Sequence, residues 1–324
     1  MKIDTMKAVV CTKYGPPEVL QYKEVDKPVP GNREIGIRLH ATAVTASDCI
    51  VRAFKIPYKH WFPLGMFMEL MMGLTLGFGK PKNPILGMVF SGVVDSVGWD
   101  AHRFKTGDPV FGWTLNSGLK IRFGTYAEYI CLPENGVIAL KPADISHEEA
   151  AAIPYGGLLA WSFLKKGKIQ ERKKVLIYGS SGAIGTSAVQ ISKHFGAHVT
   201  GVCSTRNIAL VNSLGADKVI DYTADHAEEQ LEQYDLIVDA VGKRKHSVLK
   251  GYCEKVLNTG GKSLSVDNGS PKADIHDLLF LKELVEAGEL KPVIDRSYPF
   301  DQIVEAHRYV DQGHKKGNVV IIVD

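Results

Sequence analysis

The 324-residue sequence is poor in cysteine, nearly balanced in charge and without a long uninterrupted apolar run. Its five cysteines are scattered and form no Cys-x-x-Cys pair, which argues against a disulfide framework or a cysteine-rich zinc lobe and fits a reducing compartment. A net charge of +3 without a basic block gives no reason to expect nucleic acid as a partner. The first seven residues lack the apolar core of a signal peptide, so we expect a cytoplasmic protein.

The most apolar stretch, residues 61–78, contains four of the seven methionines. Pro63, Glu69, Gly73 and Gly77 interrupt it, and it falls short of the about 20 apolar residues that cross a bilayer, so we expect no membrane span. Two interpretations of this stretch stay open. It is either a loop or short helix packed on the core, or an adaptable apolar wall or lid over a substrate pocket.

The first half of the chain is typical of short β-strands separated by proline and glycine turns. The expected strands cover residues 7–12, 34–43, 90–98, 107–112 and 125–132. Their number and spacing predict a barrel-like domain.

From about residue 146 the pattern changes to alternating strands and helices. Ser146 and Glu149 have the spacing of a capping box, which predicts a helix over 150–153 up to Pro154 and a second helix over 158–164. Strands are expected at 174–178, 199–203, 218–220, 236–240 and 262–266, and helices at 186–195, 207–214 and 246–257. Apolar strands joined by helices predict a parallel sheet covered on both faces. The tail adds helices at 278–287 and 300–311 and a strand at 318–323.

A glycine-spaced turn, Gly179-x-x-Gly182-x-x-Gly185, follows the strand at 174–178 and precedes a helix. Strand, glycine turn and helix in this order are typical of a dinucleotide-binding unit. The glycines let the backbone approach a pyrophosphate, and the helix N-terminus offers N–H groups and a positive dipole to hold it.

Ser204 stands at the end of the next strand, nineteen residues after Gly185, where the choice between NADH and NADPH is made. An NAD site places an Asp or Glu there to hold the ribose 2′-hydroxyl. A hydroxyl followed by Arg206 instead favours the 2′-phosphate of NADP(H). The alternative is that Arg206 is a solvated residue at a helix start. Tyr222, just past the third strand, is expected either at the adenine end of the cofactor or on ordinary surface.

Further motifs run in order along nearly the whole chain: Lys7-Ala-Val-Val10, Ser91-Gly-Val-Val94, residues 104–111, Ala127-Glu-Tyr129, residues 150–154, residues 179–185, Asp239-Ala-Val-Gly242 and Gly317-Asn-Val-Val320. Together they resemble the medium-chain dehydrogenase/reductase superfamily, in its zinc-independent quinone oxidoreductase-like branch. The resemblance implies an α/β fold made of a GroES-like β-barrel domain and a Rossmann doubly wound parallel sheet.

The resemblance also implies domain boundaries and cofactor contacts. We expect a GroES-like catalytic domain over 1–130, a Rossmann NADP-binding domain over 131–277 and a C-terminal return to the first domain over 278–324. The residues expected to bind NADP(H) are Gly179, Ser181, Gly182, Ala183, Ile184, Gly185, Ser204, Arg206, Tyr222, Val241, Gly242 and Asn318.

Zinc-containing members of this superfamily carry a Cys at the position of Thr45 and a His at that of Met88. Thr and Met do not replace thiolate or imidazole ligands, so we expect no catalytic metal. His194 and His198 have a metal-like spacing, but Gly196 breaks the helix between them. Without a Lewis acid, the expected reaction passes a hydride from NADPH to a quinone or to the β-carbon of an enone, where positioning and a hydrogen bond to the carbonyl suffice.

The resemblance implies a catalytic role for Thr45, at a position that is often Asn, as hydrogen-bond donor to the substrate carbonyl. Asp48 is expected to orient its loop, and Tyr58 and Tyr155 to reach the pocket. Two departures from relatives weaken the expected nicotinamide contacts: Leu159 replaces a frequent Thr, and Asp267 replaces a usual Gly.

Two other functions stay open. One is an NADP-dependent alcohol or aldehyde oxidoreductase that uses a side-chain acid. The other is a non-catalytic NADPH-binding protein, with a membrane-associated scaffold as a version motivated by residues 61–78. The chain has fewer residues than relatives between the last expected sheet strand and the helix at 278–287, so either the sheet is shortened or a segment is omitted. A homodimer is therefore only a family expectation.

Overall fold

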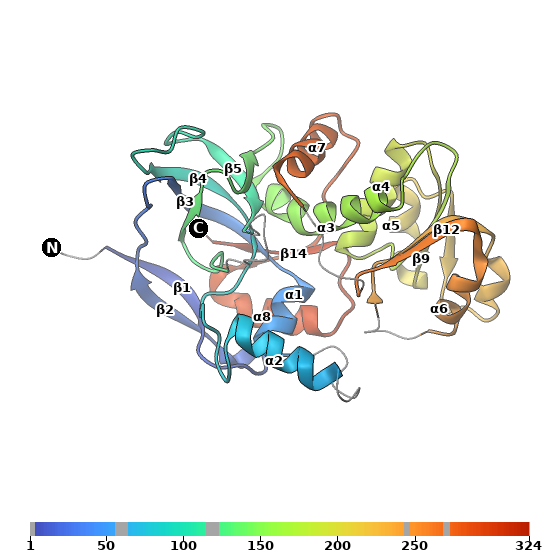
Figure 1. The fold of residues 1–324 in the computed structure, drawn as a ribbon, viewed down its shortest axis with the longest axis horizontal. Helices are drawn as coiled ribbons and strands as arrows, with labels where there is room; N and C mark the ends of the chain where they lie inside the picture. Colours follow the sequence, from blue (N-terminus) through green and yellow to red (C-terminus); the bar gives the residue numbers. More distant parts are fainter. Residues whose placement is uncertain (1–3, 56–63, 115–122, 243–246, 268–272, 324) are drawn as a thin grey trace. The chain divides into compact units, whose positions relative to one another are not determined.

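The computed structural model describes residues 4–55, 64–114, 123–242, 247–267 and 273–323 (Figure 1). The chain divides into two compact units. Unit 1 comprises residues 1–152 and 294–324, and unit 2 comprises residues 153–293.

Unit 1 contains a seven-stranded sheet of order β13-β14-β3-β4-β5-β7, in which β6 also pairs with β3. Its pairs are antiparallel except for β13 with β14. The strands are β3 (Glu34–Val44), β4 (Val89–Val97), β5 (Pro109–Trp113), β6 (Tyr129–Pro133), β7 (Val137–Leu140), β13 (Ile294–Pro299) and β14 (Asn318–Ile322). A separate antiparallel ribbon pairs β1 (Thr5–Cys11) with β2 (Leu20–Asp26).

Short helices complete unit 1: η1 (Pro17–Val19), α1 (Ala46–Ala53), α2 (Leu64–Leu76), η6 (Phe300–Gln302) and α8 (Ile303–Asp311). Helix α2 lies in the apolar stretch, for which a short helix was one of the two expectations. Among the described residues, no helix has the length and apolar character needed to cross a membrane.

Unit 2 contains a five-stranded parallel sheet of order β10-β9-β8-β11-β12. The strands are β8 (Lys174–Tyr178), β9 (His198–Cys203), β10 (Lys218–Asp221), β11 (Tyr234–Asp239) and β12 (Leu257–Ser265). Its helices are α4 (Ala183–His194), η2 (Thr205–Asn207), α5 (Ile208–Ser213), η3 (Ala227–Gln230), α6 (Val248–Cys253), η5 (Glu254–Val256) and α7 (Ile275–Glu286). In the described part of this unit the sheet ends at β12.

The helix α3 (His147–Lys166) corrects the expectation of two separate helices around Pro154. The capping box forms as predicted, since Ser146 N donates to Glu149 and Glu149 N donates to Ser146 Oγ. A proline inside a helix removes one N–H donor. The helix nevertheless continues because most residues from Ala150 to Leu164 are buried, and burial outweighs one missing hydrogen bond.

The observed units divide the chain elsewhere than at the expected boundaries of 130/131 and 277/278. The strands β6 and β7 belong to unit 1, because β6 pairs with β3 and β7 pairs with β5. The helix α7 belongs to unit 2, where Asp277 accepts a hydrogen bond from Trp161 Nε1 at 3.0 Å. The chain returns to unit 1 at β13, because that strand pairs with β14.

Candidate functional site

The glycine turn after β8 leaves no room for side chains at its first and third glycines. Gly179 has a φ of 83°, in the left-handed region that favours glycine. A Cβ on Gly179 would lie 2.4 Å from a methyl group of Val241, and a Cβ on Gly185 would lie 2.1 Å from the Gly179 carbonyl oxygen. Both glycines are therefore required by close packing.

The second glycine, Gly182, faces open space instead. It N-caps α4, no side chain caps that helix, and a Cβ built on Gly182 would have its nearest neighbour at 3.6 Å. A helix N-terminus with uncapped N–H groups beside open space is the arrangement that binds a pyrophosphate. The residues Ser181, Ala183 and Ile184 belong to this same turn and first helical turn, so the structure brings them together with the three glycines.

The loop after β11 folds back onto the glycine turn. Asp239 Oδ1 accepts hydrogen bonds from the backbone N–H groups of Val241 and Gly242, each at 3.0 Å. Its other oxygen pairs with Lys250 Nζ at 2.8 Å. Asp239 thereby holds Val241 against Gly179, a positioning role that the sequence motif did not reveal.

The end of β9 carries the residues expected to select the cofactor. Ser204 is half-buried and Arg206 is exposed. Tyr222, which is 36% exposed, donates its backbone N–H to the Cys203 carbonyl at 3.0 Å, so it lies beside this strand end. Ser204, Arg206 and Tyr222 thus share the carboxyl edge of β9 and β10.

Two residues missed by the sequence argument also lie there. Asp221, the last residue of β10, accepts a hydrogen bond from Thr205 Oγ1 at 2.5 Å. Burial raises the pKa of Asp221, but hydrogen bonds from Thr205 and Thr223 outweigh burial and keep that pKa below its ordinary value. A carboxylate therefore neighbours the segment that is expected to hold a 2′-phosphate.

The second missed residue, Asn207, links the glycine turn to the β9 loop. Its side chain is buried, and Nδ2 donates to Ser181 Oγ at 2.9 Å and, more weakly, to Ser204 Oγ at 3.4 Å. Its Oδ1 makes no hydrogen bond within the described chain. Only its place beside Arg206 in the sequence could have drawn attention to it.

In unit 1, Thr45 and Asp48 form the N-terminal cap of α1. Thr45 N and Thr45 Oγ1 donate to Asp48 Oδ2 at 2.8 and 2.6 Å, and Asp48 N donates to Thr45 Oγ1 at 3.2 Å. Both side chains are buried. Burial raises the pKa of Asp48 to about 6, although Thr45, the Tyr126 hydroxyl and the Gly87 N–H favour its charged form.

This cap changes what Thr45 can do. A threonine hydroxyl has one proton to donate, and here that proton is directed at the Asp48 carboxylate. Thr45 is therefore free to donate to a substrate only when Asp48 is protonated and donates to Thr45 in turn. The expected donor role of Thr45 stays a prediction, now tied to the protonation of Asp48.

A chain of buried polar groups leads away from Asp48 through unit 1. Arg52 Nη1 lies 3.2 Å from His307 Nδ1, and His307 Nε2 lies 3.2 Å from the Tyr126 hydroxyl. Arginine only donates, so Nδ1 accepts and Nε2 carries the proton that is donated to Tyr126. The Tyr126 hydroxyl accepts this hydrogen bond and keeps its own proton, which is available to favour the charged form of Asp48.

The far end of this chain is an ion pair. Arg52, 1% exposed, donates from Nη2 to Asp311 Oδ2 at 2.6 Å. Burial, with the charge of Arg52, lowers the pKa of His307 to about 3, so its imidazole stays neutral near pH 7. Of Asp48, Tyr126 and His307, Asp48 has the pKa nearest to neutrality, which suits proton transfer.

The other residues named from the sequence fall outside the sets described above. Tyr58 lies outside the described residues. Asn318 begins β14 in unit 1, whereas the other residues expected to bind the cofactor belong to unit 2. Tyr155 and Leu159 are buried on α3 within unit 2. Asp267 lies beside Gly242, where its carboxylate oxygens would be 2.7 Å from an added Cβ.

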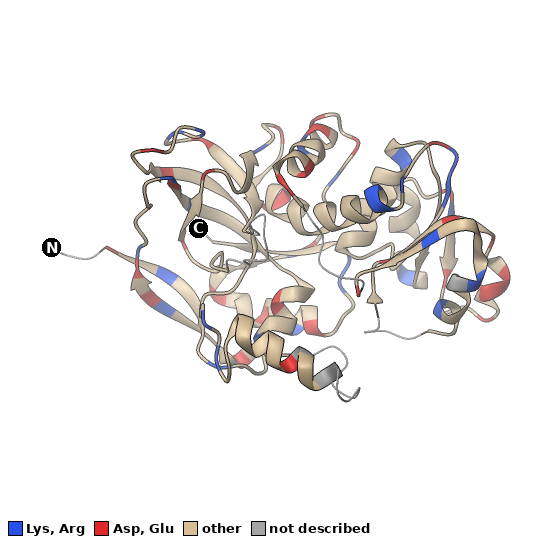
Figure 2. Ribbon diagram, viewed as in Figure 1, with Lys and Arg blue, Asp and Glu red and all other residues tan. Residues whose placement is uncertain are grey.

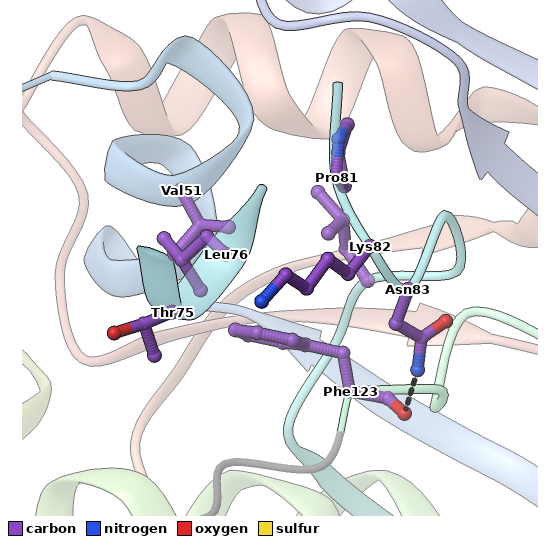
Figure 3. A pocket seen from close by; sticks show the side chains of 8 residues that line it. Val51, Thr75, Leu76, Pro81, Lys82, Asn83 and Phe123 are labelled. Carbon is purple, nitrogen blue, oxygen red and sulfur yellow. Dashed lines mark hydrogen bonds between the residues drawn. The ribbon is translucent and has the colours of Figure 1, made fainter. Parts of the chain in front are cut away.

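Unit 1 also has a cavity of about 110 Å³ (Figure 3). Thr45 and Asp48 are not among the described residues that line it. Asn83 Nδ2 donates to the Phe123 carbonyl at 2.8 Å and fixes one wall. The lining combines apolar side chains with one lysine, one hydroxyl and one amide: Val51, Thr75, Leu76, Pro81, Lys82, Asn83, Leu86 and Phe123.

Thr45 and Met88 stand at the two positions where the zinc-containing members of the superfamily carry metal ligands, and both are buried. In the described parts of the chain, no three His, Cys, Asp or Glu side chains gather as a metal site. His194 pairs with Glu289, and His198 Nδ1 lies 3.3 Å from Asp217, so these two histidines have separate acidic partners. No residue set described here fits a metal ion.

Known proteins resemble this chain over almost its full length. Residues 31–142 match the family described as alcohol dehydrogenase GroES-like domain. Residues 214–321 match the family described as zinc-binding dehydrogenase, and this matched range does not contain Thr45 or Met88. The mitochondrial NAD(P)H oxidoreductase RTN4IP1 of Mus musculus is 33% identical, covering 98% of this chain and 89% of its own. The 2-methylene-furan-3-one reductase of Solanum lycopersicum is 32% identical, covering 98% and 79%.

A solved structure agrees with this picture. The quinone oxidoreductase from Coxiella burnetii superposes with a TM-score of 0.83 at 25% identity, covering 99% of this chain and 100% of its own. The chain therefore belongs to the medium-chain dehydrogenase/reductase superfamily, with a GroES-like domain and a Rossmann-type parallel-sheet domain. Within it, the chain belongs to the quinone oxidoreductase-like branch, which confirms the prediction from its motifs.

Proposed function

We propose that this protein is an NADPH-dependent reductase of quinones or of α,β-unsaturated carbonyl compounds. The observation that carries the proposal is the glycine turn of unit 2, with open space at Gly182 and an uncapped α4 N-terminus. Relatives named NAD(P)H oxidoreductase, 2-methylene-furan-3-one reductase and NADPH-dependent alkenal/one oxidoreductase support the substrate class.

The preference for NADPH over NADH rests on Ser204 and Arg206 at the end of β9. A guanidinium forms strong charge-assisted hydrogen bonds with a phosphate, and no acid follows β9 at the position that would hold a ribose 2′-hydroxyl. Asp221 acts against this preference because its carboxylate lies beside Thr205. We propose that Arg206 outweighs Asp221, so that NADPH remains preferred.

In the proposed reaction the bound nicotinamide supplies a hydride to an electrophilic carbon of the substrate. The electrons that leave the carbon–carbon or carbon–oxygen double bond then require a proton. We assign its supply to Asp48, through Thr45: protonated Asp48 donates to Thr45 Oγ1 while Thr45 passes its own proton on. Solvent afterwards returns a proton to Asp48.

The direct test follows NADPH consumption with three acceptors, 9,10-phenanthrenequinone, an alkyl enone and an aldehyde, and in a control without acceptor. NADH replaces NADPH in a parallel series, and EDTA is present throughout. Turnover of quinone or enone with NADPH would support the proposal. Turnover of the aldehyde alone would favour the alcohol or aldehyde oxidoreductase. Tight NADPH binding without turnover of any acceptor would favour a non-catalytic NADPH-binding protein.

A further inference from the structure

Helix α2 presents an apolar face to solvent. At about 100° per residue, its exposed apolar positions fall on one continuous face, and Glu69, which is also exposed, lies at the edge of that face. Contiguous exposed apolar side chains of this kind mark binding surfaces. The face consists of Met66 (62% exposed), Phe67 (59%), Leu70 (50%), Met71 (47%) and Leu74 (54%).

Other contacts hold α2 on unit 1. The Phe78 ring packs over Gly73, where an added Cβ would lie 2.1 Å from it. The Tyr14 hydroxyl donates to the Gly77 carbonyl at 3.1 Å, and Lys82 N donates to the Leu76 carbonyl at 2.7 Å. Leu76 also lines the cavity shown in Figure 3. The exposed face of α2 is therefore not the part that attaches the helix to the protein.

Positive charge flanks this apolar face. Figure 2 shows that α2 contains almost no charged residues. Residues 55–82 contain four lysines and one acid. Lys55 precedes the helix and Lys80 follows it, and both are exposed, whereas Lys82 donates from Nζ to the Leu74 carbonyl and lines the cavity of Figure 3. An apolar surface flanked by cations is complementary to a bilayer with anionic headgroups.

We propose that α2 docks this protein on the surface of an anionic lipid bilayer. The five apolar side chains would enter the boundary between headgroups and acyl chains, and the lysines would contact the headgroups. Thirteen residues span about 20 Å at about 1.5 Å each, against about 30 Å of hydrocarbon. The helix therefore lies in the interface and does not cross it.

The same charges disfavour a second copy of the chain as the occupant. A twofold interface brings the same patch of both copies together, so the flanking lysines would approach lysines. An anionic bilayer surface can bury the apolar face, and its headgroups attract the lysines. The docking does not depend on the proposed catalytic activity.

The test mixes full-length protein with vesicles of phosphatidylcholine, alone or with an equal amount of phosphatidylglycerol, and measures the bound fraction by sedimentation. We expect binding to the mixed vesicles that weakens with added salt and is several-fold weaker on phosphatidylcholine alone. Leu70→Ser with Leu74→Ser should weaken binding at least about tenfold. Lys55→Gln with Lys80→Gln should weaken it about tenfold on the anionic vesicles only.

The matched control replaces two exposed valines far from α2 in sequence, Val29→Ser with Val248→Ser (85% and 75% exposed), and should bind vesicles like the unmodified protein. Circular dichroism and NADPH binding check that each variant folds. Absence of binding by the unmodified protein, or unchanged binding by the double leucine variant, would overturn the proposal. Concentration-dependent self-association without vesicles that this variant abolishes would assign the face to a second copy instead.

Discussion

At the scale of single residues, burial shifts the pKa of Asp48, and this shift has a consequence that can be measured. Its pKa is raised to about 6 in the folded protein, whereas an unfolded aspartate keeps a pKa near 3.9. The folded state therefore binds the proton more tightly. The resulting stabilisation is fully present below about pH 4 and is lost as the pH rises through about 6.

His307 has the opposite effect, because its folded-state pKa of about 3 lies below its ordinary value of 6.5. The two trends oppose each other in the unmodified protein. We predict that Asp48→Asn removes the favourable trend, so that the variant loses about 2 kcal/mol relative to the unmodified protein between pH 6.5 and 4.5. Urea unfolding across this range measures the difference, with the exposed Asp301→Asn as control. Parallel stability curves for the two proteins would show that Asp48 does not titrate there.

Arg206 and Asp221 are predicted to move cofactor preference in opposite directions. Arg206→Ala should raise the KM for NADPH about tenfold and leave that for NADH nearly unchanged, because a charge-assisted contact with phosphate is lost. Asp221→Asn keeps an acceptor for Thr205 but removes a negative charge, so it should favour NADPH over NADH by about threefold. Steady-state kinetics with both cofactors decide this. Equal losses with NADH and NADPH in either variant would contradict the assignment.

The sequence predicted Ser204 and Arg206 but missed Asp221 and Asn207, for a physical reason. Asp221 reaches Thr205 because β10 pairs with β9 in register, Asp221 opposite Cys203. Asn207 matters because its buried amide reaches back to Ser181 in the glycine turn. Strand order and side-chain direction create both contacts, and neither follows from the spacing of residues along one strand.

At the scale of elements, the turn from β8 into α4 gives its glycines different tasks. Gly179 and Gly185 are closed in by packing, whereas Gly182 has an extended backbone and open space before it. Gly182→Leu should therefore fold with a stability change of about 1 kcal/mol or less and lose at least about 100-fold in NADPH affinity, because its side chain fills the space assigned to pyrophosphate. Fluorescence titration and thermal unfolding measure the two effects.

The control is Gly251→Leu, since a Cβ on Gly251 would have no neighbour within 4 Å and this glycine lies on α6, away from the turn in sequence. It should leave NADPH affinity unchanged. An affinity loss of similar size in both variants would mean that Gly182 is not at the cofactor.

One prediction about the elements was wrong. Pro154 suggested a break between two helices, yet α3 is continuous because the buried run from Ala150 to Leu164 stabilises it.

At the scale of the whole molecule, the main parallel and antiparallel sheets were predictable, but the limits of the two units were not. Alternating strands and helices identify the parallel sheet because each apolar strand needs helical cover. Assignment of β6, β7 and α7 instead depends on pairing and packing between residues far apart in the chain, such as β3 with β6 and Trp161 with Asp277. The local sequence pattern does not indicate which distant residues these elements contact.

The division into units leads to a last prediction, because Arg52 and the residues assigned to the cofactor phosphates lie in different units. Arg52→Leu leaves Asp311, which is 25% exposed, without its partner, and removes the donor that sets the His307 tautomer. Breaking a buried pair costs about 3–5 kcal/mol, and partial exposure of Asp311 reduces this to about 2–4. Unit 1 should therefore unfold earlier, whereas NADPH affinity, carried by the glycine turn and Arg206 of unit 2, should stay within about twofold. Limited proteolysis with mass spectrometry would locate the early cuts, and NADPH titration of the same variant would test the second half. Cleavage first within residues 153–293, or a large loss of NADPH affinity, would show that the two units do not respond separately.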